Sequence, residues 1–272
     1  MDNLLAPILT LTGLGVAFGA GLALAAKKFC VTVDPRLEKI YAQLPGANCG
    51  ACGKPGCIGF AEGLIKGTCS IEGCVVAEEK VREMIAGVLG VEHKVKLKKV
   101  AVLHCNGGNK RAGDKFEYSG IRSCLSANLI AGGPKACIYG CIGYGDCQRV
   151  CPFGAITMNE EGLPVVDEYK CTACGKCVAA CPKNLFSLTS TEKNYAVLCR
   201  SLDLGKKVMQ ACSVGCIACR KCEKACPVEA IKMIDNLSVI DYNICDNHGE
   251  CFRVCPTKSI ARKENKLWKT RL

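Results

Sequence analysis

The chain has 272 residues and a formal net charge of +11, and 25 of its residues are cysteines. Aromatic residues make up only 6% of it, which is too few for one large side-chain core. The composition therefore predicts several small domains, each held by disulfides or metal. It argues against a TIM barrel, a large doubly wound sheet and an all-helical bundle.

Residues 4–26 contain no charged residue. A helix of that length rises about 34 Å, enough to cross the hydrocarbon core of a bilayer. Lys27 and Lys28 follow it and only Asp2 precedes it, so the positive-inside rule places the N-terminus outside. A cleaved signal peptide would need a basic start and a shorter apolar core. We expect an uncleaved single-pass anchor over residues 1–28 in the cell inner (cytoplasmic) membrane, with the bulk of the chain in the cytoplasm.

A cytoplasmic body keeps thiols reduced, so the cysteines are interpreted as metal ligands rather than disulfides. Two runs have the spacing C-x2-C-x2-C-x3-C-P of bacterial ferredoxins, which bind [4Fe-4S] clusters. Zinc ribbons use paired C-x2-C knuckles instead. The ligands predicted from these two runs are Cys171, Cys174, Cys177, Cys181, Cys216, Cys219, Cys222 and Cys226.

Two further runs depart from this pattern at their middle position, where Tyr144 and His248 stand. Their cysteines are Cys137, Cys141, Cys147 and Cys151 in the first and Cys245, Cys251 and Cys255 in the second. We expect Cys137 to replace the missing ligand of the first run. In the second run His248 is a candidate, because imidazole also binds iron–sulfur centres; a three-iron cluster or no cluster are the alternatives. Cys212 is a spare that could displace Cys219.

The four runs form an internal repeat, with a short strand and turn between the two runs of each pair. This predicts two tandem two-cluster ferredoxin modules, at residues 132–191 and 205–264. In such modules the last cysteine of each run ligates the other cluster. The expected sets are Cys137, Cys141, Cys147 and Cys181; Cys171, Cys174, Cys177 and Cys151; Cys216, Cys219, Cys222 and Cys255; and Cys245, Cys251 and Cys226.

A different block lies within residues 45–74, where Cys49, Cys52 and Cys57 are followed by Cys74 at a distance. Three close thiolates in a glycine-rich loop and one distant thiolate suit a further four-iron cluster, in a domain at residues 33–92. Cys69 competes for the fourth position. A redox-active C-x2-C pair is the other interpretation.

These motifs resemble the B subunit of the Rnf complex, a membrane ferredoxin:NAD oxidoreductase that translocates sodium ions or protons. The resemblance includes the apolar N-terminal span, the block NCGACGKPGC ending at Cys74, the stretch GGPKACIYGCIGYGDCQRVCPFGAI and the ferredoxin run from Cys171. The second module is similar to that of longer members from anaerobic bacteria. The resemblance implies that the chain accepts electrons from reduced ferredoxin and passes them to other subunits of the complex.

The remaining segments contain few candidate functional residues. Residues 77–89 have helical periodicity and residues 98–104 are typical of a strand, giving a small α/β connector at 93–131; residues 265–272 form a basic tail. We expect Cys105 and Cys124 to be buried structural thiols. No role is assigned to Cys30 or Cys199, and His93 and His104 are expected to be ordinary histidines.

The fold class expected is therefore an α+β multidomain iron–sulfur protein with about five [4Fe-4S] clusters. Five oxidised clusters would offset roughly ten positive charges, so the basic excess does not indicate nucleic acid. The chain lacks G-x-G-x-x-G and G-x-x-x-x-G-K-[ST], so we expect no nicotinamide, flavin or ATP site and no catalytic residue. The alternatives are a polyferredoxin subunit of another membrane reductase or hydrogenase and, from another class, a zinc- or nucleic-acid-binding module.

Overall fold

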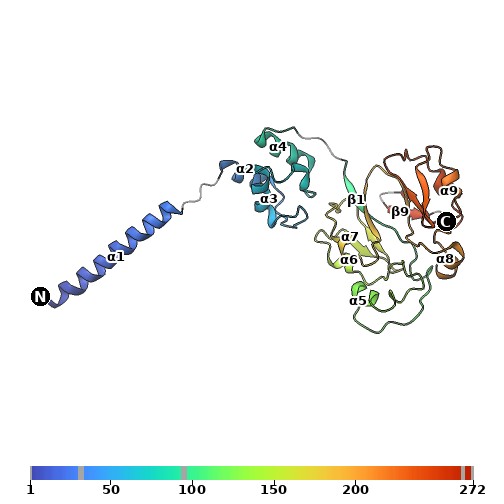
Figure 1. Ribbon diagram of the computed structural model, residues 1–272, viewed down its shortest axis with the longest axis horizontal. Helices are drawn as coiled ribbons and strands as arrows, with labels where there is room; N and C mark the ends of the chain where they lie inside the picture. Colours follow the sequence, from blue (N-terminus) through green and yellow to red (C-terminus); the bar gives the residue numbers. More distant parts are fainter. Residues whose placement is uncertain (1, 30–33, 93–96, 265–266, 271–272) are drawn as a thin grey trace.

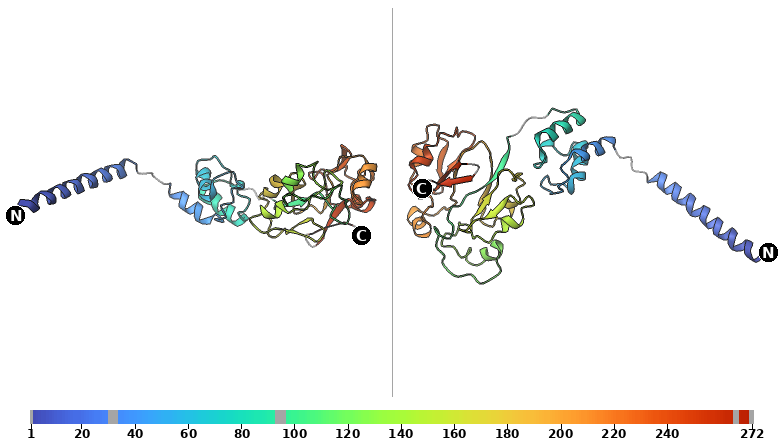
Figure 2. Two further views of the ribbon diagram at one scale, coloured as in Figure 1. Left: turned by 90° about the horizontal axis from the view of Figure 1, so that it is seen from below. Right: turned by 180° about the vertical axis from the view of Figure 1, so that it is seen from behind.

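The computed structural model describes residues 2–29, 34–92, 97–264 and 267–270. The molecule is elongated, with a long helix at one end, a small helical domain next to it and a strand-containing body at the other end (Figures 1 and 2). Cys30 and His93 lie outside the described residues.

Helix α1 (Asp2–Lys28) extends away from the rest of the chain (Figure 1). Its segment Ile8–Lys28 is long and apolar enough to cross a membrane, and none of it is buried inside the protein. Leu9 and Leu22 are 66% and 72% exposed, a cost in water that a lipid environment removes. The helix therefore indicates a single membrane anchor.

The small domain consists of helices α2 (Pro35–Gln43), α3 (Gly56–Ile65) and α4 (Glu79–Leu89) and the short 3-10 helix η1 (Ile71–Gly73). Asp34 caps α2 by accepting a hydrogen bond from the backbone N–H of Arg36 at 2.9 Å, which satisfies one of the free donors at a helix start. The core of the domain gathers one apolar face from each helix, represented by Ile40, Phe60, Leu64 and Ile85.

The first ferredoxin module contains two antiparallel strand pairs. Strand β2 (Ile156–Met158) pairs with β3 (Pro164–Val166), and β1 (Lys99–Leu103) pairs with β4 (Phe186–Ser190). The helices are α5 (Cys124–Asn128), α6 (Asp146–Arg149) and α7 (Lys176–Ala180). The strand expected in the connector is thus present as β1, and it is paired with the last strand of this module.

The second module repeats this arrangement. Strand β6 (Ile231–Ile234) pairs with β7 (Leu237–Ile240), and β5 (Tyr195–Val197) pairs with β8 (Ile260–Glu264), to which β9 (Leu267–Thr270) adds a third strand. Its helices are α8 (Gly205–Ala211), α9 (Lys221–Lys224) and α10 (Glu250–Val254). Part of the expected basic tail is therefore a sheet strand.

The two modules pack against each other through their outer strands. Val102 of β1 is fully buried against Ala196, Leu198 and Ala261 of the second module. His104, which follows β1, donates from Nδ1 to the carbonyl of Val197 at 2.8 Å, and its Nε2 lies 2.6 Å from the hydroxyl of Ser187. His104 is thus a structural residue of the contact between the modules.

Candidate iron–sulfur sites

Five cavities of similar size, each lined by four cysteines, lie in the domains described above. Their volumes, including their open mouths, are about 290 to 420 Å³. Within the described ranges, no three His, Cys, Asp or Glu side chains converge closely enough for a single metal ion. A zinc ion would need its ligand sulfurs at about 2.3 Å. Sulfurs spaced around a wider cavity instead suit the outer corners of an iron–sulfur cube.

In the N-terminal domain, the cavity is lined by Cys49, Cys52, Cys57 and Cys74. Asn48 shapes the loop, because its side-chain oxygen accepts a 2.8 Å hydrogen bond from the backbone N–H of Cys57 at the start of α3. Cys69 is not among the residues that line this cavity. The geometry thus favours Cys74 over Cys69, the choice that the resemblance implies.

In the first module, one cavity is lined by the expected set Cys151, Cys171, Cys174 and Cys177. Backbone N–H groups point at the sulfurs: Ala155 donates to Sγ of Cys151 and Ala101 to Sγ of Cys171, both at 3.4 Å. Such bonds stabilise thiolate and tune the potential of a cluster. Because Ala101 belongs to β1, the strand before the module contributes directly to this cavity.

The other cavity of this module does not have the expected composition. It is lined by Cys141, Cys147 and Cys181, as predicted, and by Cys124. Cys137, expected as the fourth ligand, lines a different cavity, so the structure does not bring it to the other three. Burial raises the pKa of Cys147 to about 12, and the nearby Cys124 and Cys181 sulfurs contribute to the rise.

Asp146 explains the position of Cys124. Its carboxylate accepts hydrogen bonds from the hydroxyl of Ser123 at 2.9 Å and from the backbone N–H of Leu125 at 3.1 Å. These two residues flank Cys124, and Asp146 precedes Cys147. The aspartate thus holds both cysteines at one cavity, although they are far apart in the sequence. No cysteine spacing reveals this tether, which is why the sequence assigned Cys124 no ligand role.

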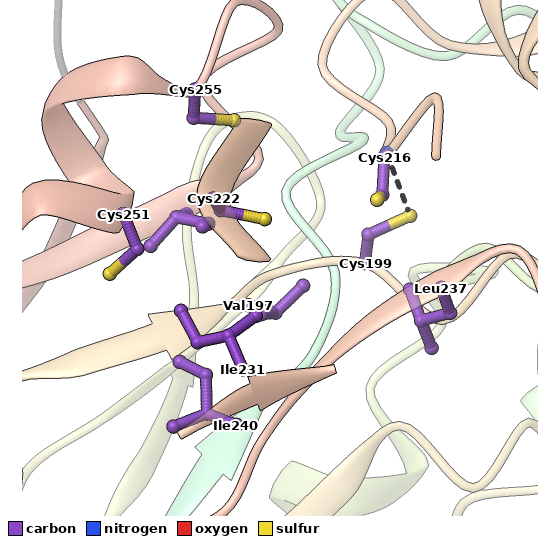
Figure 3. Packing of buried hydrophobic residues seen from close by; sticks show 10 residues of the cluster. Val197, Cys199, Cys216, Cys222, Ile231, Leu237, Ile240, Cys251 and Cys255 are labelled. Atoms are coloured by element: carbon purple, nitrogen blue, oxygen red, sulfur yellow. Dashed lines mark hydrogen bonds between the residues drawn. The ribbon is translucent and has the colours of Figure 1, made fainter. Parts of the chain in front are cut away.

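In the second module, the cavity is lined by Cys216, Cys219, Cys222 and Cys255, the expected set. Cys212 is not among them. Burial raises the pKa of Cys255, but hydrogen bonds from the Ser259 side chain and nearby backbone groups outweigh it, so that the net pKa is lowered. In Figure 3 the sulfurs of Cys222 and Cys251 point in opposite directions, and Cys251 is not among the residues that line this cavity.

The last candidate site contains Cys226, Cys245 and Cys251. Burial raises the pKa of Cys251 to about 12, with smaller contributions from the neighbouring sulfurs, including Cys245 and Cys226. His248 is half exposed, and its Nδ1 lies 2.6 Å from the Asp246 carboxylate. A carboxylate that fixes Nδ1 leaves Nε2 as the ligand atom, an arrangement common at metal-binding histidines.

The fifth cavity was not predicted. It is lined by Cys105, Cys137, Cys199 and Cys212. The sequence assigned two of these cysteines to other sites and treated Cys105 as structural and Cys199 as without a role.

This arrangement defines a class: a membrane-anchored protein with several iron–sulfur sites in ferredoxin-like modules. Family models agree, since an Fe-S cluster family matches residues 44–76 and the 4Fe-4S dicluster domain matches residues 136–185 and 215–259.

Curated relatives cover nearly the whole chain. It is 44% identical to the B subunit of the Na(+)-translocating ferredoxin:NAD(+) oxidoreductase complex of Acetobacterium woodii, over 96% of this chain and 78% of that protein. It is 40% identical to the B subunit of the ion-translocating oxidoreductase complex of Methanosarcina acetivorans, over 93% and 96% of the two chains. It is 40% identical to the B subunit of the proton-translocating ferredoxin:NAD(+) oxidoreductase complex of Clostridium ljungdahlii, over 96% and 93%.

The chain therefore belongs to the family of B subunits of Rnf-type ion-translocating ferredoxin:NAD oxidoreductases. It is the electron-transfer iron–sulfur subunit of such a complex.

Proposed function

We propose that this subunit accepts electrons from reduced ferredoxin and holds them in five [4Fe-4S] clusters on the way to the other subunits. The observation that carries the proposal is the gathering of cysteine sulfurs at separate sites in the N-terminal domain and both modules. Each bound cluster would supply reversible one-electron transfer. The protein contributes thiolates, hydrogen bonds to sulfur and burial, which set the potential.

Four of the proposed ligand sets follow the cavities, and the fifth is taken from the last candidate site. They are Cys49, Cys52, Cys57 and Cys74; Cys124, Cys141, Cys147 and Cys181; Cys151, Cys171, Cys174 and Cys177; Cys216, Cys219, Cys222 and Cys255; and Cys226, Cys245 and Cys251 with His248. The N-terminal domain at 33–92 and the modules at 132–191 and 205–264 remain the proposed units. The segments that precede the two modules contribute β1, α5 with Cys124, and β5.

The surface around Cys219 is the proposed site of electron entry. Cys219 is the one exposed cysteine among the described cysteines. Arg220, Lys221 and Lys224 beside it are exposed and basic, and Glu223 is partly buried. A basic surface attracts a donor with negative charge and speeds encounter. A cluster here would lie near the surface and within reach of a docked donor.

We further propose that α1 crosses the cytoplasmic membrane with its N-terminus outside, because Lys27 and Lys28 end the helix and basic residues favour the cytoplasmic side. The domains would then lie in the cytoplasm, where a soluble donor can reach them. In sealed inside-out vesicles, protease should digest the domains; protection of the domains would contradict this orientation.

The decisive experiment measures reduction of the purified, cluster-loaded chain by a ferredoxin kept reduced under anaerobic conditions. Stopped-flow loss of visible cluster absorbance should be fast and saturable with ferredoxin concentration. The control donor is NADH, for which we expect no direct reduction. A chain reducible by dithionite but not by ferredoxin would contradict the proposed donor.

A further inference from the structure

The cavity lined by Cys105, Cys137, Cys199 and Cys212 lies between the two modules. Its cysteines come from four separate segments. Cys105 follows β1, Cys137 lies in the loop after α5, Cys199 follows β5 and Cys212 directly follows α8. Its volume of about 420 Å³ is comparable to those of the other four-cysteine cavities. In volume and in number of sulfurs, this cavity therefore resembles the four cavities proposed to bind clusters.

The sulfurs of this cavity accept backbone hydrogen bonds as the proposed ligands do. The N–H of Cys141 donates to Sγ of Cys105 at 3.4 Å, and the N–H of Cys216 donates to Sγ of Cys199 at 3.3 Å. Figure 3 shows the second of these bonds, with Cys199 beside Cys216. In the first module Ala101 and Leu185 donate to Cys171 and Cys181 in the same way. Buried thiolates around an anionic cluster need such donors.

The backbone around the cavity leaves space for the sulfurs and holds the segments that carry them together. A β-carbon at Gly107 would lie 3.0 Å from Sγ of Cys212 and 3.9 Å from Sγ of Cys105, so only glycine leaves this space to the sulfurs. Ala112 forms a β-bridge with Cys212, and the N–H of Ser213 donates to the carbonyl of Arg111 at 2.9 Å. These contacts fix the end of α8 to the loop that carries Cys105.

Other occupants fit less well. A disulfide would use two sulfurs and leave the cavity open, and no disulfide joins any of the four cysteines. A zinc ion requires tightly converging ligands, and no group of ligands among the described residues converges so closely. Arg200 also lines the cavity, and its positive charge would offset part of the negative charge that four thiolates give to an iron–sulfur cluster.

We infer that Cys105, Cys137, Cys199 and Cys212 bind a further [4Fe-4S] cluster, a sixth site in this chain. The two hydrogen bonds to its sulfurs place it between the modules: Cys141 lines a cavity of the first module and Cys216 one of the second. This cluster would connect the two pairs of clusters. The inference rests on the proposed loading of the other cavities with clusters.

The test is the double variant Cys105→Ala/Cys199→Ala, with Cys69→Ala as the matched control because Cys69 lines none of the five cavities. Iron and acid-labile sulfide per chain are measured anaerobically, together with native mass spectrometry of the intact clusters. We expect the double variant to lose four irons and one cluster, and the control to lose none. Equal iron in double variant and wild type would overturn the inference, as would zinc at this site. If wild type holds no iron at all, the proposed function itself fails.

Loss of several clusters would show that the double variant no longer folds. The test is then made on the wild-type chain. An iron-edge anomalous difference map, or a cryo-electron microscopy map of the intact complex, should show four-iron density between the four sulfurs. Density at the other cavities with none at this one would refute the sixth site and leave the proposed function standing.

Discussion

The ammonium group of Lys263 lies 3.3 Å from the carboxylate of Glu168, and the two side chains are only 8% and 6% exposed. Glu168 follows β3 of the first module and Lys263 belongs to β8 of the second. A buried ion pair thus joins the two modules, in addition to the apolar contact of Val102.

Breaking this pair should destabilise the protein. Removing one partner leaves the other charge buried, at a cost of about 3 kcal/mol. Glu168→Gln should therefore lower the thermal midpoint by several degrees, measured anaerobically at one scan rate. Glu168→Gln/Lys263→Met should recover most of the loss, because no unpaired charge remains. Lys66→Gln is the control, since its pair with Glu62 is exposed, and an equal loss in this control would contradict the explanation.

Cys124 should matter for iron binding, although it belongs to no cysteine run. Cys124→Ala removes one of four sulfurs from its cavity, so we expect loss of one to four irons per chain and a changed electron paramagnetic resonance signal from one cluster. Unchanged iron and spectra would show that Cys124 is a structural thiol. Cys69→Ala serves as the control.

Asp146→Ala should weaken the same cluster without removing a ligand. The variant loses the hydrogen bonds to Ser123 and Leu125 that hold Cys124 in place. Iron content directly after purification should stay near that of wild type, but release of iron to a chelator should be several times faster. Glu62→Ala is a suitable comparison, because its pair with the exposed Lys66 lies on the N-terminal domain. Equal release rates in wild type and Asp146→Ala would contradict the role of this tether.

His248→Ala should remove the proposed fourth ligand of the last site, so that site should lose between one and four irons. His248→Cys should keep the iron and shift its midpoint potential to more negative values, because imidazole ligation raises the potential of iron–sulfur centres relative to thiolate. Redox titration followed by electron paramagnetic resonance measures both effects. Iron content and potential that are unchanged in His248→Ala would exclude imidazole ligation.

The triple variant Arg220→Glu/Lys221→Glu/Lys224→Glu tests the proposed entry surface. Reversing its charge should slow reduction by ferredoxin at least tenfold at low salt, and the difference from wild type should shrink as ionic strength rises. Reduction by dithionite should stay unchanged, which shows that the clusters are intact. Lys66→Glu on the N-terminal domain is the control for a charge reversal away from this surface. Equal rates of reduction by ferredoxin in the triple variant and wild type would show that electrons enter at another surface.

Cysteines that share a cavity because they lie in one loop could be predicted from the sequence. The C-x2-C-x2-C runs place Cys171, Cys174 and Cys177 around one cavity because a short loop determines their geometry. The crossed position of Cys181 also followed from the repeat. The strand at 98–104 was recognisable from its residues, and the apolar N-terminal helix from its length.

Cysteines that only the tertiary structure brings to one cavity could not be predicted. Cys124 reaches its cavity through Asp146, and Cys105 and Cys199 meet only because β1 and β5 pack against each other. Cys137 was assigned to the nearest run because spacing was the only guide. The pairing of β1 with β4 and of β5 with β8 spans long separations in the sequence, and local pattern gives no register for such pairs.

The burial of Val102 limits how this protein can be shortened. Residues of the second module cover its side chain. In a chain that ended after the first module, the apolar residues of β1 would be exposed to water, and the uncovered sheet could pair with other chains. We therefore expect truncation after the first module to promote aggregation. A soluble one-module form would also require polar substitutions on β1. Loss of the second module and a change in the surface of the first module must therefore occur together.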